Sequence, residues 1–320
     1  MWPFGKRKKQ GLTIDPAYGD PGTRTLLDAL ARKDWQTARD ILTPIADPDE
    51  LAYTMEAVGS VDGLQDWIGD WIAAEPRSTL PVLVRGCHAV HWAWDARGGA
   101  RAEQTREEQF REFHRRLRIA EHLLADVAAR DNDDVTARTW LVTSSRGIQI
   151  DRDIAQARFD AVVTRHPTHV IAHEQRLQYL CAKWFGSHDE MFEFAHTATA
   201  AAPAGSLLWE LLPVAHLEKW LDVPAEDGAD KAYITSAEVR ADLTRAADGS
   251  VLHPSYRFRP AATPRVATFA MTLEMTGEFE RASRTHEILG DRVSAWPWQY
   301  CGNPVDVFEN SRLWVRNNLP

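Results

Sequence analysis

Apolar side chains recur three or four residues apart along most of the chain, and Gly or Pro interrupts them at short intervals. This spacing places them on one face of an α-helix. Residues 165–203 show the pattern twice, on either side of Gly186, and Ser187 is placed to cap the second helix. The apolar positions of these two stripes are Val170, Leu177, Leu180 and Cys181, then Met191, Phe194, Ala195 and Ala198. The pattern predicts a helical hairpin, which needs neighbours to bury its apolar faces.

The hairpin layout repeats at a regular interval. Asp131 to Pro167 spans 36 residues (167 − 131), and Pro167 to Pro203 spans 36 again (203 − 167). Each interval contains a helical stripe, a Gly turn and a second stripe. This period is close to the ~34 residues of tetratricopeptide repeats, whereas the residue identities match that motif poorly. We therefore predict an all-α fold of stacked antiparallel hairpins, a tetratricopeptide-like α-solenoid with an extended concave face.

Domain organisation follows from where the helical pattern begins. Residues 1–22 are rich in Gly, Pro and charge, which predicts a flexible tail. Residues 23–320 carry helical stripes without a convincing run of strands, which predicts a single repeat-like domain, best supported over 80–220. The Pro-rich stretch 248–264 predicts a long connection, and the sequence leaves open whether it covers the groove.

Two local signals predict helix ends and helix surfaces. Thr235 and Glu238 form a T-x-x-E capping box, which predicts a helix start. The pairs Glu107–Arg111 and Glu112–Arg116 have the favourable order for ion pairs along one helix face.

Composition and charge narrow the function classes. The 320 residues are 44% hydrophobic and 26% charged, typical of a globular protein, and the net charge of −9 argues against a nucleic-acid partner. Three cysteines far apart and no apolar run of membrane-span length favour a cytoplasmic protein with reduced thiols. The basic stretch Lys6 to Lys9 is expected to be a solvated tail, with weak contact to an anionic membrane surface as the alternative.

Several short motifs indicate a family. They are Trp94, Arg97 and Gly98, then His166 and Pro167, then Lys183, Trp184, Gly186, Ser187, Phe194 and Ala195. Together the segments that contain them, over about residues 80–220, resemble an uncharacterised bacterial family with a tetratricopeptide-like helical fold. The resemblance implies this fold and a role in binding other proteins, and it implies no established activity.

Histidines provide the main candidates for chemistry. His166, His169 and His173 have the spacing H-x-x-H-x-x-x-H, which places two imidazoles on one helix face and suits a Zn²⁺ ion if a third ligand joins them. His88, His91 and Asp95 share another face, and we expect them to pack in the core rather than to catalyse. Trp296 and Trp298 are expected to hold the C-terminal part against the body, with a peptide-binding surface as the alternative.

The sequence lacks the usual nucleotide-, hydrolase- and calcium-binding motifs. We therefore expect a protein without catalysis, a scaffold that docks a partner protein or peptide on its concave face. Trp94, Arg97, Lys183 and Trp184 are the predicted partner-binding residues, because Trp and Arg contribute most binding energy at interfaces. The alternative is a metal-binding protein or metal-dependent enzyme that uses His166, His169 and His173; otherwise no cofactor is expected.

Overall fold

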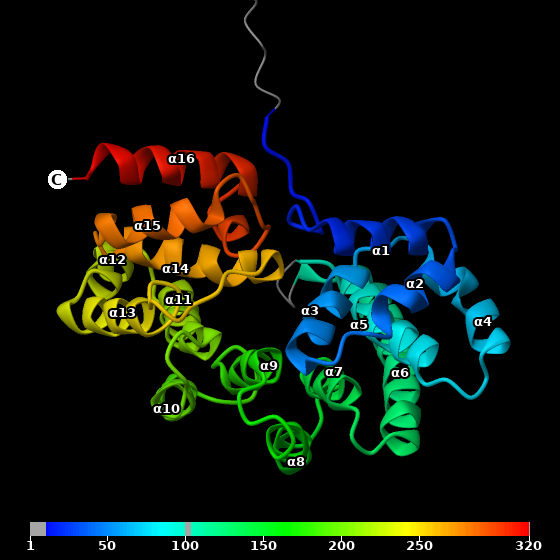
Figure 1. Ribbon diagram of the computed structural model, residues 1–320. Helices are drawn as coiled ribbons and strands as arrows, with labels where there is room; N and C mark the ends of the chain where they lie inside the picture. Colours follow the sequence, from blue (N-terminus) through cyan, green and yellow to red (C-terminus); the bar gives the residue numbers. More distant parts are fainter. Residues whose placement is uncertain (1–10, 100–103, 320) are drawn as a thin grey trace, which may run out of the picture.

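A computed structural model describes residues 11–99 and 104–319. In this part of the chain, α-helices are joined by turns and by longer connections such as the one between α13 and α14, and the single β-type pairing is an isolated parallel bridge between Ile14 and Val293. The prediction of an all-α protein is confirmed. Figure 1 shows the helices in chain order, from α1 in blue to α16 in red.

The N-terminal half of the described chain contains α1 (Pro21–Ala31), α2 (Trp35–Leu42), α3 (Pro48–Val58), α4 (Leu64–Ala74), α5 (Leu80–Arg97), α6 (Glu107–Arg130), α7 (Val135–Ser145) and α8 (Arg152–Val163). The C-terminal half contains α9 (Val170–Leu180), α10 (His188–Ala200), α11 (Leu211–Asp222), α12 (Ala229–Ile234), α13 (Ala237–Gly249), α14 (Thr263–Met275), α15 (Phe279–Leu289) and α16 (Pro304–Asn317). Short 3-10 turns are η2 (Leu207–Glu210), η3 (Glu226–Gly228), η4 (Pro260–Ala262) and η5 (Trp298–Tyr300).

Most helix ends follow the predicted local rules. Ser187 caps α10 by accepting a hydrogen bond from the Glu190 backbone N at 3.2 Å. A Cβ at Gly186 would lie 2.2 Å from the backbone oxygen of Leu180, so this turn requires glycine. The predicted T-x-x-E box is wrong by one residue, because Ser236 caps α13 through the Val239 backbone N at 3.4 Å.

The long helix α6 bears out one of the two predicted ion pairs. Arg116 Nε lies 2.6 Å from Glu112 Oε1. Arg111 lies 4.0 Å from Glu108 instead of pairing with Glu107. Glu107 and Glu108 are both in the first turn of α6. Pairing of Arg111 with either of them leaves this helix face solvated and charged.

Two large apolar clusters form the interior. One cluster collects residues of α1 to α7, with Trp71 and Trp140 fully buried in it. The other collects residues of α9 to α16 together with Ala52 and Tyr53 of α3. Helix α3 therefore contributes to both clusters, and it contacts α5, α7 and α9. Most other helices pack on their neighbours in the chain, as stacked hairpins do.

The two halves also meet at the start of the described chain. Residues before α1 lie against the segment after α15, where Ile14 pairs with Val293 and Arg292 Nε donates to the Tyr18 carbonyl at 3.0 Å. Figure 1 shows this blue N-terminal segment descending between the two groups of helices. Of the tail predicted over residues 1–22, residues 1–10 lie outside the described residues. The junction between the halves holds the pocket described next.

Candidate functional site

A pocket of about 570 Å³ lies between the two halves of the protein. Segments that are far apart in the sequence line it, from the stretch before α1, from α3, from the end of α7, and from α9, α11, α14 and the Ala295–Trp296 loop. The polar and aromatic members of the lining are Tyr18, Tyr53, Glu56, Ser60, Arg146, Glu174, Gln175, Gln178, Glu210, Arg265 and Trp296. We call this cavity the central pocket. Its size suits a small molecule.

One wall of the central pocket is built on a buried arginine. Arg265, in the first turn of α14, is 4% exposed. Its Nε and Nη2 donate to the two oxygens of Glu174 at 2.6 and 2.7 Å, and its Nη1 and Nη2 donate to Glu56 at 3.1 and 3.2 Å. The guanidinium lies 4.5 Å from the centre of the Tyr53 ring. Arg265 thus ties α14 to α3 and α9 with charge-assisted hydrogen bonds.

A third carboxyl group stands beside this network. Glu210, at the junction of η2 and α11, is 2% exposed, and its Oε2 has no hydrogen-bond partner among the described residues. Burial raises the pKa of Glu210 well above its ordinary value, and the nearby Glu174 carboxylate raises it further. Burial thus favours the neutral form of this carboxyl group, whose Oε2 is without a partner among the described residues.

A second cationic side chain borders the central pocket. Arg146, which follows α7, places its guanidinium 5.1 Å from the Trp94 ring and 5.5 Å from the Trp184 ring. Its Nε and Nη1 are buried and have no hydrogen-bond partner among the described residues. Burial lowers the pKa of Arg146 to about 10, and this side chain stays cationic at neutral pH. A cation between two indole faces with free donors is a ready recognition group.

The structure brings the four predicted partner-binding residues together. Trp94 and Trp184 come from α5 and from the turn after α9, and their ring centres are 6.1 Å apart. Arg97 lies over the Trp94 ring at 5.7 Å, and Lys183 pairs with Glu218 at 2.6 Å. We call Trp94, Trp184 and Arg146 the tryptophan–arginine cluster. The sequence had placed its two tryptophans on one surface without the arginine between them.

The predicted metal-binding histidines are hydrogen-bonded within the fold. His169 caps α9, since its Nδ1 accepts from the Ala172 backbone N at 3.4 Å, and its Nε2 lies 3.3 Å from Thr139 Oγ1. His166 Nε2 lies 3.0 Å from Asp49 Oδ2, and His173 Nδ1 lies 2.8 Å from the His169 carbonyl. In the described part of the chain, no three His, Cys, Asp or Glu side chains are arranged to hold a metal ion. The structure gives the zinc alternative no support.

The other histidine stripe lies in the core of the N-terminal half. His88 Nε2 lies 2.9 Å from the Val61 carbonyl, and the His91 ring packs edge-on against Trp140 at 5.0 Å. Gly59 makes room for His91, because a Cβ there would lie 2.2 Å from the imidazole. Burial lowers the pKa of His91 to about 4. These contacts agree with the expected packing role, and exposed Asp95 completes no site with them.

Trp296 and Trp298 hold the C-terminal segment against the body, as expected. Trp298 is fully buried and packs against His286 and Phe308. Trp296 donates its Nε1 hydrogen to Thr268 Oγ1 at 2.9 Å and contributes to the wall of the central pocket.

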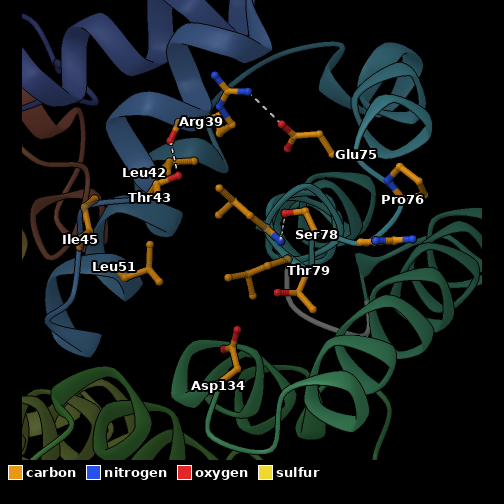
Figure 2. Close-up of a pocket in the computed structure, with 13 residues that line it drawn as sticks. Arg39, Leu42, Thr43, Ile45, Leu51, Glu75, Pro76, Ser78, Thr79 and Asp134 are labelled. Carbon is orange, nitrogen blue, oxygen red and sulfur yellow. Dashed lines mark hydrogen bonds and ion pairs between the residues drawn. The ribbon is translucent and has the colours of Figure 1, made fainter.

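A second, shallower cleft of about 740 Å³ lies in the N-terminal half, between α2, α3 and the turn before α5 (Figure 2). Several of its polar groups have partners within the fold. Arg39 lies 3.0 Å from Glu75, Thr43 Oγ1 donates to the Arg39 carbonyl at 2.8 Å, and Asp134 caps α7 through the Ala137 backbone N at 2.7 Å. Because these donors and acceptors are satisfied, they offer a ligand less than the unpartnered groups of the central pocket do.

The sequence analysis did not single out Arg146, Glu210 or Arg265. One signal was present. Glu210 interrupts the apolar run Leu207–Leu212, and a carboxyl group inside such a run is either paired or functional. The other partners come together only in the folded protein.

Comparison of the sequence with known proteins assigns the chain to no family. No known family model matches the chain, and no curated protein matches it either. In the described residues no helix is long and apolar enough to cross a membrane. The function must therefore be argued from the site.

Proposed function

We propose that the protein is a non-catalytic binding protein that docks an acidic segment of a partner protein at the tryptophan–arginine cluster. The observation that supports this most is the position of Arg146. Its guanidinium lies between two indole rings that come from segments about 90 residues apart, and two of its donors have no partner. Arg146 is partly exposed as a whole although its Nε and Nη1 are buried, so a partner carboxylate would approach the accessible part of the side chain and be attracted by the charge of the guanidinium.

Charge supports an acidic partner. Arg97, Arg146 and Lys183 surround the two tryptophans, and Glu218 is the carboxylate that pairs with Lys183. This cationic group stands on a protein whose net charge is −9. A local group of cationic side chains attracts an acidic segment at short range even when the net charge of the protein is negative. Both tryptophans are partly exposed, so a segment can reach them.

Selection of peptides tests the proposal directly. Random dodecapeptides displayed on phage would be selected against the wild-type protein. Enriched peptides would then be synthesised with their Asp and Glu residues intact and with each replaced by Asn or Gln. We expect enrichment of acidic peptides, with at least about tenfold weaker binding to Arg146→Gln and Trp184→Ala.

The matched control is Trp314→Ala, because Trp314 lies on α16 and is 56% exposed. This variant should bind as the wild type does, and circular dichroism should show all three variants folded. Enrichment without acidic residues, or equal binding by folded Arg146→Gln, would contradict the proposal.

A further inference from the structure

The central pocket has more carboxyl groups at one wall than cations to pair with them. Glu56, Glu174 and Glu210 meet there, and Arg265 is the cation in contact with them. A guanidinium has five N–H donors in a fixed planar arrangement. Arg265 already makes four hydrogen bonds to Glu56 and Glu174. Glu210 is left beside this pair without a cationic partner.

We propose that the central pocket binds a small organic cation, a primary alkylammonium, with its ammonium group against Glu210. This site adjoins the tryptophan–arginine cluster, since Arg146 borders the central pocket, but the ammonium is assigned to the wall that Glu174 and Glu210 form. The observation behind it is that Glu210 lines the pocket and is buried, and that its Oε2 has no hydrogen-bond partner among the described residues. Leaving such an oxygen unpaired costs free energy, and a ligand that donates to it recovers that cost.

The rest of the wall suits an ammonium better than an anion or a neutral group. Glu174 is close enough to Glu210 to affect its charge, so an ammonium with three donors can reach both carboxyl groups. Tyr18, Tyr53 and Trp296 add aromatic rings to the lining. The Tyr53 ring already faces a cation, because Arg265 lies 4.5 Å from its centre. At this wall an anionic ligand would instead meet the carboxylates that pair with Arg265, and the other cation of the lining, Arg146, comes from the end of α7.

Size limits the ligand to a small molecule. The volume of about 570 Å³ accommodates a chain of several methylenes with one or two amino groups. The apolar part of the wall, including Ala57, Val214 and Pro264, would contact the methylenes. A diamine such as cadaverine therefore makes a suitable probe.

Binding should release a proton. Burial raises the pKa of Glu210 and favours its neutral form, whereas an ammonium beside it favours the carboxylate. The incoming ammonium keeps its own protons, the Glu210 carboxyl loses one to solvent, and an ammonium–carboxylate pair results. Up to one proton per bound ligand enters the buffer.

Titration calorimetry tests this on the full-length protein. Cadaverine and butylamine would be titrated at pH 7 in phosphate and in MOPS, buffers that contain no primary amine and whose ionisation enthalpies differ. We expect binding of at least one amine, with a buffer-dependent heat that reports proton release, and no binding of 1,5-pentanediol or glutarate. Glu210→Gln should bind at least about tenfold more weakly and release no proton.

Two control variants separate this site from other effects. Glu226→Gln removes one negative charge at an exposed position in η3 and should bind amines as the wild type does. Trp184→Ala changes the tryptophan–arginine cluster at a residue that does not line the central pocket, and it should retain amine binding, so failure of the partner-docking proposal would not affect this result. Absence of binding by both amines up to about 10 mM contradicts the inference. So does equal binding with equal proton release by folded Glu210→Gln.

Discussion

Two clusters of ionisable side chains lie on either side of α9, and they differ in whether their polar atoms have partners. At the start of α9, the nitrogens of His169 lie near a backbone amide and Thr139, and His166 pairs with Asp49. In the central pocket, every nitrogen of the Arg265 guanidinium donates to a carboxylate, whereas Glu210 Oε2 and two nitrogens of Arg146 have no partner among the described residues. The histidines looked functional in the sequence, and the pocket residues did not.

The difference separates structural polar groups from recognition groups. A buried polar group that is satisfied by the fold stabilises that fold and has nothing left for a ligand. A buried polar group without a partner destabilises the empty protein and gains most when a ligand arrives. On this argument the histidine cluster is part of the architecture, and the central pocket and its border are where binding occurs.

The largest expected effect tests the paired side of the pocket. Arg265→Leu would leave Glu56 and Glu174 buried without their cation, which should lower the free energy of unfolding by about 3–5 kcal/mol. Urea unfolding followed by circular dichroism measures this. Arg312→Leu is the control, because Arg312 pairs with Asp291 at an exposed position and should cost less than about 1 kcal/mol. Equal losses in the two variants would show that the Arg265 network is not structural.

Helical periodicity and breakers were enough to predict the fold class and the local elements. The stripes around Gly186 predicted α9 and α10, and the interval before Pro167 predicted α7 and α8. These features depend on residues within one or two turns of each other. The one-residue error at Ser236 arose because Thr235, Ser236 and Glu238 all favour a helix start, and only the backbone decides which hydroxyl caps it.

The central pocket could not be predicted in the same way. Its Arg265 pairs with Glu56 and Glu174, which are 209 and 91 residues away in the chain. No local spacing encodes such contacts, and charged residues at helix starts are usually exposed. Trp94 and Trp184 were predicted to share a surface because each belongs to a motif, but Arg146 between them belongs to none.

The second effect tests the histidine side through pH. Burial lowers the pKa of His169 to about 4, below the ordinary value of 6.5, and the neighbouring Asp49 only partly offsets this. Between about pH 6.5 and pH 4, His169 therefore binds a proton in the unfolded chain and stays neutral in the folded protein. Stability is fully present above about pH 6.5 and is lost as the pH falls towards 4, by up to about 3 kcal/mol for this group.

Urea unfolding between pH 7 and 4 measures that loss. His169→Asn keeps a capping side chain at the start of α9 and removes the titration, so its stability should depend less steeply on pH. His196→Asn, at a side chain that is 45% exposed, should leave the slope of the wild type unchanged. An unchanged slope in folded His169→Asn would mean that His169 does not contribute to the acid sensitivity.

A smaller effect is expected at the carboxylate that serves the histidines. Asp49 accepts from the Val170 backbone N at 2.9 Å and lies 3.0 Å from His166. Asp49→Ala should lower the free energy of unfolding by about 1–2 kcal/mol, because a helix-end amide loses its acceptor. Asp70→Ala, on the exposed side of α4, should change it by less than about 0.5 kcal/mol. Indistinguishable variants would show that Asp49 does not join α3 to α9.

The smallest expected effect on the free energy of unfolding is that of a substitution at Glu210. Its pKa is raised by burial and by Glu174 above the ordinary value of 4.5, so the folded protein keeps a proton that the unfolded chain releases. This contribution to stability is fully present below about pH 4.5 and is lost as the pH rises towards the raised pKa. Glu210→Gln keeps the size of the protonated side chain and cannot titrate. Near pH 5 it should differ from the wild type by less than about 1 kcal/mol in unfolding free energy.

As the pH is raised from 5 to 8, the balance should move in favour of Glu210→Gln, because the wild type alone loses the contribution of the buried proton. The pH dependence that both proteins share, including that of the histidines, cancels in the difference between their unfolding free energies. A difference that stays constant across this range would mean that Glu210 is ionised in the folded protein. In that case the carboxyl group would already have a cationic partner, and the central pocket would not differ from the histidine cluster in having an unpaired buried group.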